Sequence, residues 1–265
     1  MKSFSLGAVW EETIALLRRE HALLVPVALA LFGPAQIMIE LGVPHEMPAA
    51  GTGQAPGGAL LLVFPAMILV FLANLAITRL ALIPGISVAE ALSGGLRRLP
   101  RALGATLLLG TAVMGIGIVI VTGATIGILS FGGDPRSPTM ASQLVVLVMI
   151  PALVLLVRML LLVPSVAMED RRTIDSVRRG WALGKGIALR LAAMLALLLL
   201  LTMVVQLIET FVVGSLFQLL ALATDQGELA KILHMLVNAA IDSLLSLGFT
   251  VYVALAYRAV AARVV

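Results

Sequence analysis

Residues 164–190 read PSVAMEDRRTIDSVRRGWALGKGIALR, and this basic stretch decides how the rest of the chain is interpreted. Very apolar runs precede it at 143–163 and follow it at 191–224. A basic segment between two apolar runs of membrane length is typical of a cytoplasmic loop at a bilayer surface. The stretch therefore indicates a membrane protein and suggests its orientation, but it points to no reaction.

The composition also predicts a protein that crosses the membrane several times. Of the 265 residues, 61% are apolar and 12% are charged, whereas soluble domains are about 45–50% apolar and about 25% charged. The net charge of +4 fits a positive-inside bias better than nucleic-acid binding, so we expect no nucleic-acid partner. The lack of cysteine excludes disulfides, thiolate catalysis and cysteine-bound metals. Charged residues within 1–20 argue against a cleavable signal peptide.

The hydropathy pattern predicts an all-α, polytopic membrane protein in which residues 1–265 form one integral membrane domain. Residues 1–21 are expected to form an amphipathic N-terminal helix, because four apolar residues are spaced to lie on one of its faces: Leu6, Trp10, Ile14 and Leu17. This helix either lies in the membrane interface or packs on the same protein as an extramembrane helix. The six predicted membrane spans cover about 22–41, 58–83, 103–131, 143–163, 187–210 and 236–257.

The apolar run after the basic stretch is too long for one crossing, since about 20 residues suffice. Span five is therefore expected to end near Glu209. Residues 211–224 then either lie along the interface or extend the helix beyond it.

Lysine and arginine are distributed unevenly over the loops that six spans create. Three precede span one, four lie from Arg79 to Arg101, seven lie from Arg158 to Arg190, and two follow span six. Thus 16 of the 18 lie on one side, and only Arg136 and Lys231 on the other. By the positive-inside rule, both termini are expected in the cytoplasm.

Two segments, 78–99 and 157–183, share a pattern that predicts an internal repeat. Each has an arginine at the end of an apolar helix, then a proline, then a short amphipathic helix with an acidic residue, then a new span. Both lie on the predicted cytoplasmic side, so the repeat is expected to be parallel. The short helices are expected to be interfacial elbow helices.

The second elbow, 172–185, is expected to form a helix parallel to the membrane surface. Ile174, Val177 and Trp181 are spaced for one helical face, and basic residues flank that face. The predicted partners are anionic lipid headgroups, with a membrane-protein partner or a second copy of the chain left open. The candidate headgroup contacts are Arg171, Arg172, Arg178, Arg179, Lys185 and Trp181.

The residues of this elbow resemble a family pattern. Pro164, Glu169 and the run SVRRGWALGKG at 176–186 look like P-x-x-x-x-E followed by A-L-x-R-S-W-x-L-x-x-G. That pattern resembles a bacterial inner-membrane family known as the membrane domain of glycerophosphoryl diester phosphodiesterases, or as YciC-like proteins. The chain departs from it at Gly180, where the family has serine. In that family the phosphodiesterase activity belongs to a separate soluble barrel, so the resemblance implies a fold and no catalytic residue.

Polar residues within predicted spans are candidates for function, because an unpaired ionisable group in the membrane is costly. In span six, His234, Asn238, Asp242, Ser246 and Thr250 recur every four residues. This stripe either lines a crevice that opens outward or leaves only Asp242 buried. We expect Asp242 to meet polar partners from span five or one. The candidate intramembrane residues are Asp242, Asn238, Ser246, Gln206, Glu209 and Arg158.

The sequence shows no nucleophile–base set, HExxH, GxSxG or Walker motif. We therefore expect a non-enzymatic integral membrane protein of the cell envelope that acts through lipids or protein partners, with no catalytic residue, cofactor or metal. A small-solute or lipid transporter and an intramembrane enzyme are the alternatives.

Overall fold

The computed structural model describes residues 5–42, 60–130, 138–169, 173–184 and 188–262. Every secondary-structure element within these ranges is helical. In chain order the elements are α1 (Leu6–Gly42), α2 (Leu60–Leu82), α3 (Val88–Ser130), α4 (Pro138–Met159), α5 (Leu162–Met168), α6 (Thr173–Gly184), α7 (Ala188–Ile208), the π-helix η1 (Glu209–Val213), α8 (Gly214–Thr224) and α9 (Gly227–Ala261).

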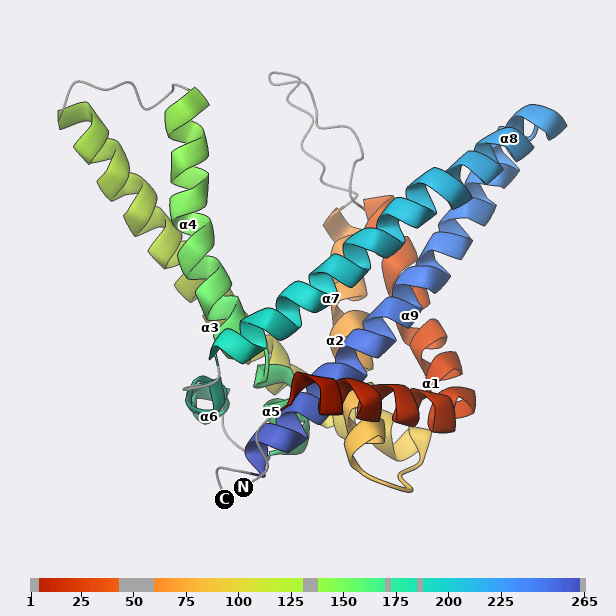
Figure 1. Cartoon of the computed structure of the whole chain (residues 1–265), viewed down its shortest axis with the longest axis horizontal. Coiled ribbons are helices and arrows are strands. Elements are labelled where there is room, and N and C mark those ends of the chain that lie inside the picture. Colours follow the sequence, from red (N-terminus) through yellow and green to blue (C-terminus); the bar gives the residue numbers. More distant parts are fainter. Residues whose placement is uncertain (1–4, 43–59, 131–137, 170–172, 185–187, 263–265) are drawn as a thin grey trace.

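Six helical runs within the described ranges are long and apolar enough to cross a membrane. Their bounds are Leu6–Gly42, Leu61–Leu82, Val88–Ser130, Leu147–Met168, Leu189–Thr224 and Gly227–Ala261. The prediction of an all-helical protein with six membrane-length helices is therefore confirmed. Helix α1 begins and α9 ends at the same end of the molecule, together with α5 and α6 (Figure 1). We call this end the terminal face.

Helix α1 is bent at Glu20, whose backbone angles (φ −107°, ψ 15°) are not helical. The bend separates the predicted amphipathic segment from the first span, and the amphipathic segment crosses the bundle at the terminal face (Figure 1). Val9 of this segment is buried, and the Trp10 ring meets the ring of Tyr252 edge-on at 5.7 Å. Glu12 also forms an ion pair with Arg258. The segment therefore packs on the protein itself, which is one of the two placements that the sequence left open.

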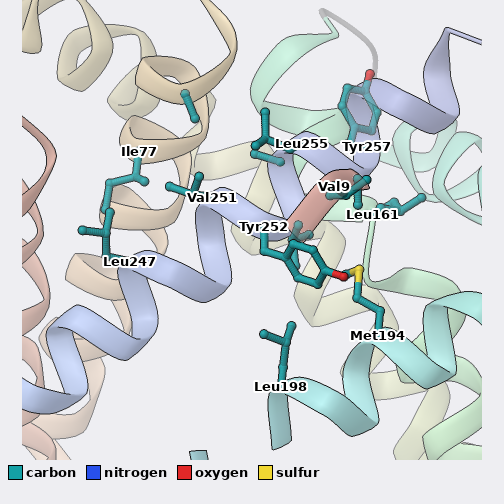
Figure 2. Close-up of a cluster of buried hydrophobic side chains, with 14 of the residues drawn as sticks. Val9, Ile77, Leu161, Met194, Leu198, Leu247, Val251, Tyr252, Leu255 and Tyr257 are labelled. Carbon is teal, nitrogen blue, oxygen red and sulfur yellow. The ribbon is translucent and has the colours of Figure 1, made fainter. Parts of the chain in front are cut away.

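The terminal half of α9 is the centre of the main hydrophobic core (Figure 2). All residues from Thr250 to Tyr257 are buried, on every side of the helix. A helical stretch that is buried on every side is enclosed by other parts of the protein. Here α1, α2 and α5 pack against it, and Met194 and Leu198 of α7 join the same core.

The fifth membrane-length run is longer than predicted. Helix α7 continues without a break through η1 and α8 to Thr224, and the chain reverses at Asp225, which adopts the left-handed conformation (φ 55°). The helix-extending alternative for 211–224 is therefore the one observed, and α9 begins at Gly227 instead of near residue 236. The apolar run has no residue that stops the helix before this turn.

The two copies of the predicted repeat fold differently. In the first copy, α3 runs from Val88 to Ser130, so its elbow segment is continuous with a membrane-length helix. In the second copy, α4 ends at Met159, and the short α5 and the separate α6 follow. The break precedes α5 because Pro164 has no N–H to donate to the carbonyl of Leu160. The parallel repeat and the interfacial position of the elbows stay predictions.

Away from the terminal face, the helices diverge into two arms (Figure 1). The α3–α4 arm consists of the outer parts of α3 and α4. The α7–α9 arm consists of α7, η1, α8 and the outer half of α9. Met114 and Val119 of α3 are 68% and 71% exposed, so the described chain leaves much of the first arm uncovered.

Candidate functional site

A cavity of about 590 Å³, which we call the lateral cavity, lies where the two arms meet. Helices α2, α3, α4, α5, α7 and α9 all contribute to its wall, which is mostly aliphatic. Gly110 of α3 and Ala152 of α4 line it, and such small residues leave space between the helices. Leu156 and Leu199, also in the wall, are 52% and 56% exposed. The cavity is therefore open at the outer surface of the helix bundle.

The polar part of this wall is uncharged. Among the described lining residues, the polar side chains are those of Asn74, Thr78, Thr106 and Thr250. Thr250 Oγ1 lies 2.7 Å from Asn74 Oδ1 and 2.8 Å from the carbonyl oxygen of Ser246. Asn74 Nδ2 donates to the carbonyl of Val70 at 2.8 Å. These bonds fix the Asn74 amide across the contact of α2 with α9.

A second apolar cavity, of about 690 Å³, lies between the amphipathic segment of α1 and helix α7. Leu6 and Trp10 line one side, and Leu197 and Leu201 line the other. Tyr252 also contributes to this wall, and its Oη donates to the carbonyl of Leu6 at 3.3 Å. The amphipathic segment is thus tied to α9 and covers an apolar groove beside α7.

The polar stripe of the sixth span divides into two parts. At the outer part, His234 Nε2 lies 3.6 Å from Glu209 Oε1. The Asn238 amide, in the orientation that satisfies both groups, donates to both Glu209 oxygens at 2.8 Å. At the inner part, Ser246 and Thr250 belong to the wall contact described above. Glu209 itself is only 7% exposed.

Asp242 lies between these two parts and is half-buried. It is within electrostatic range of Glu209 from the fifth span and of Glu40 from the first span. Gln206, the other partner that we expected for it, is exposed. We call Glu40, Glu209, His234, Asn238 and Asp242 the polar cluster. The described residues contain no group of three His, Asp or Glu side chains that could hold a metal ion.

The buried Glu209 lies at the start of the π-helix. Glu209 is its first residue, and the N–H of Gly214 donates to the Glu209 carbonyl five residues back. The extra residue in this turn rotates the helix, and π-helical turns are frequent at functional sites. This turn could not be predicted from the sequence, because the residues from Glu209 to Val213 carry no pattern that distinguishes a π-helical turn from an α-helical one.

The candidate headgroup residues are described only in part. Arg171, Arg172 and Lys185 lie outside the described residues, as do the side chains of Arg158 and Arg179. On α6, Arg178 is exposed, and the apolar Ile174 and Trp181 are 70% and 41% exposed. Exposed cationic and apolar side chains on one short helix are suited to a lipid interface.

Gly180 of α6 lies against Leu162 of α5. A Cβ at this position would lie 3.6 Å from Leu162 Cα, which is ordinary van der Waals contact. The contact therefore has room for the first atom of the serine that the resembled pattern carries here.

Two predicted repeat segments meet at the C-terminal end of α5, in a junction that sequence reasoning missed. Arg79 Nη1 donates to the carbonyl of Ala167 at 3.5 Å, and Arg98 Nη1 donates to the same oxygen. Cations at a helix C-terminus are favoured by the helix dipole. Next to it, Tyr257 Oη donates to Glu169 Oε1 at 2.8 Å. We call these five residues the elbow junction.

Comparison with known proteins assigns the chain to a family. Residues 5–260 match the family model described as Domain of unknown function (DUF7847). The chain belongs to this family. The DUF7847 description names no activity and no link to the phosphodiesterase membrane domain or to YciC-like proteins. Searches of curated proteins and of solved structures gave no match. The DUF7847 assignment thus covers nearly the whole described chain but gives no function. The function therefore has to be inferred from the site.

Proposed function

We propose that this chain is a non-enzymatic integral membrane protein of the cell envelope that acts by holding lipid between its two arms. The observation that carries the proposal is the lateral cavity. Its volume of about 590 Å³ falls within the range of about 300–1,000 Å³ that is usual for small-molecule sites. Because its wall is mostly aliphatic and open at the outer surface, an acyl chain can enter it directly from the bilayer.

The surroundings of the cavity support a lipid rather than a water-soluble ligand. In this proposal the open side of the cavity faces acyl chains, because helices of membrane length form its wall. The second apolar cavity, beneath Trp10, and the exposed Ile174 and Trp181 of α6 add further surfaces suited to lipid. Anionic headgroups are the proposed partners of the basic 164–190 stretch, because 16 of the 18 Lys and Arg residues belong to one predicted side.

The proposed location is the inner membrane of a bacterium, with both termini in the cytoplasm. The charge distribution supports this orientation, and the common end of α1 and α9 agrees with an even number of spans. The resemblance of 164–186 to the phosphodiesterase membrane-domain family supports the same location. In this proposal, no catalytic residue is carried over from that family.

A small-solute or lipid transporter is the second candidate, and the polar cluster favours it. Three acidic residues, Glu40, Glu209 and Asp242, come from three different helical elements inside membrane-length helices. Ionisable groups at such positions commonly mark ion or proton paths. An intramembrane enzyme is the third candidate, and it would depend on the His234–Glu209 pair.

The experiment that tests lipid binding fills the lateral cavity. Leu156→Trp places a large ring in the cavity wall, while Leu153→Trp makes the same change on the same helix at a residue outside the wall. The two leucines are matched in exposure, at 52% and 50%. Lipid bound to the purified protein is counted by native mass spectrometry. We expect L156W to lose bound lipid and L153W to retain it, and equal lipid content in both variants would overturn the proposal.

A further inference from the structure

The hydroxyl of Thr78 is a feature of the lateral cavity that acyl-chain binding leaves unexplained. Thr78 lines the cavity and is 1% exposed, and its Oγ1 has no hydrogen-bond partner among the described residues. By contrast, the hydroxyls of Thr202 and Ser243 donate to the preceding turn, Thr202 to the carbonyl of Leu198 at 2.9 Å and Ser243 to that of Ala239 at 2.6 Å. A buried hydroxyl without a partner is costly, so each case calls for an explanation.

Thr78 belongs to a band of neutral polar groups in the cavity wall. Asn74 lies one turn earlier on α2, and its Oδ1 is in contact with Thr250 Oγ1 of α9. Thr106 of α3 lines the same cavity. No charged side chain occurs among the described lining residues. The band can therefore form hydrogen bonds with a ligand, but it provides no counter-charge for a phosphate.

The band lies toward the terminal end of the cavity. Thr78 directly precedes Arg79, whose guanidinium donates to the Ala167 carbonyl in the elbow junction. The apolar wall continues away from that junction, to Val113 of α3 and Ala152 of α4. A bound molecule would thus have its polar group near the terminal face and its chain between the arms.

We infer that the lateral cavity takes a neutral glycerolipid, with one acyl chain between the arms and a hydroxyl or ester group hydrogen-bonded to Thr78. The inference rests on the proposed function and names the ligand class of the same cavity. A neutral polar group matches the wall, whereas an unpaired phosphate against an aliphatic wall is unfavourable. A phospholipid is expected to leave its headgroup outside and to bind more weakly.

The test compares two probes that carry the same photoactivatable acyl chain, a diacylglycerol and a phosphatidylglycerol, in nanodiscs of one lipid composition. We expect the diacylglycerol probe to label the wild-type chain more strongly. Thr78→Val should lower that labelling about threefold to tenfold, as expected for the loss of one hydrogen bond, and leave phosphatidylglycerol labelling unchanged. Thr78→Ser keeps a hydroxyl and should keep the labelling. Thr111→Val, which removes an exposed α3 hydroxyl outside the cavity wall, should also keep it.

The outcomes separate this inference from the proposed function. Equal labelling by both probes, or equal labelling of T78V and wild type, overturns the neutral-lipid inference, and so does a T78S variant that loses labelling as T78V does. In these cases L156W should still lose labelling by both probes, and the proposed function stands. If L156W keeps the labelling of both probes, the proposed function fails and this inference fails with it. Size-exclusion profiles that match the wild type show that each variant is folded.

Discussion

Replacing Tyr257 by phenylalanine removes one hydroxyl from the elbow junction and tests how strongly this junction holds the fold. Tyr257 is 6% exposed, and its Oη donates to Glu169 Oε1 at 2.8 Å. A hydrogen bond to a charged group contributes about 1.5–3 kcal/mol. Phenylalanine keeps the ring packing but leaves the carboxylate without this donor. We therefore expect Y257F to lower the free energy of unfolding by about 2 kcal/mol.

The chain contains only one other tyrosine, and it provides a matched control. Tyr252 lies on the same helix and is 1% exposed, but its Oη donates to a neutral backbone carbonyl, that of Leu6, at 3.3 Å. A long bond between neutral groups contributes about 0.5–1 kcal/mol. Y252F should therefore cost less than Y257F, although it makes the same chemical change at an equally buried position.

Both variants are measured by reversible unfolding in mixed micelles, followed by tryptophan fluorescence. A double-mutant cycle that adds Glu169→Gln isolates the interaction of the Tyr257 and Glu169 side chains. A coupling energy near zero, or a Y252F variant that loses as much stability as Y257F, would refute the reasoning. It would mean that the bond to the carboxylate does not account for the loss of stability in Y257F.

Three further predictions address other parts of the chain. A Cβ at Gly94 would lie 2.5 Å from the Cζ atom of Arg79 in the elbow junction, so Gly94→Ala should displace this guanidinium from the Ala167 carbonyl, and the loss of about 0.5–1.5 kcal/mol should offset the gain in helix propensity of about 0.5–1 kcal/mol. A Cβ at Gly115 would have no atom within 4 Å, so Gly115→Ala should stabilise α3 by up to about 1 kcal/mol. A lower free energy of unfolding for Gly115→Ala than for Gly94→Ala in the same assay would contradict this reasoning. Asp225→Cys introduces a single cysteine into a chain that has none, and this cysteine should react with a membrane-impermeant reagent in intact cells. A reaction that occurs only after permeabilisation contradicts the proposed orientation. Asp242→Asn should leave the free energy of unfolding unchanged or raised, because it removes repulsion from Glu40, and a loss above about 1 kcal/mol would mean that the carboxylate itself holds the helices together.

The features that hydropathy and charge determine locally were the ones that could be predicted. The six membrane-length helices follow from runs of apolar residues, and the bend at Glu20 falls where the amphipathic pattern changes to a continuous apolar one. The helix over the second elbow follows from the spacing of Ile174 and Trp181. Each of these features depends on residues close together in the chain.

The sites depend on residues far apart in the chain, and they could hardly be predicted from local patterns. Tyr257 and Glu169 are 88 residues apart, and Thr250 and Asn74 are 176 apart. The residues around one partner of such a pair do not indicate which residue it contacts. The lateral cavity is still harder to predict, because it depends on the angle between helices that are each simply apolar. The choice between the two alternatives for residues 211–224 was also left open, since an apolar run shows where a helix can continue but not whether it does.

The α7–α8 run is longer than the hydrocarbon core of a bilayer is thick. The 36 residues from Leu189 to Thr224 extend over about 54 Å at about 1.5 Å per residue, whereas the hydrocarbon core is about 30 Å thick. Even at a tilt of about 40°, the upper end of the usual range, the run still spans about 41 Å. Its outer end carries exposed apolar side chains, including Phe211 and Leu222. A thicker membrane would cover more of these side chains at a smaller tilt, so we expect the acyl-chain length of the host bilayer to change the tilt of the α7–α9 arm.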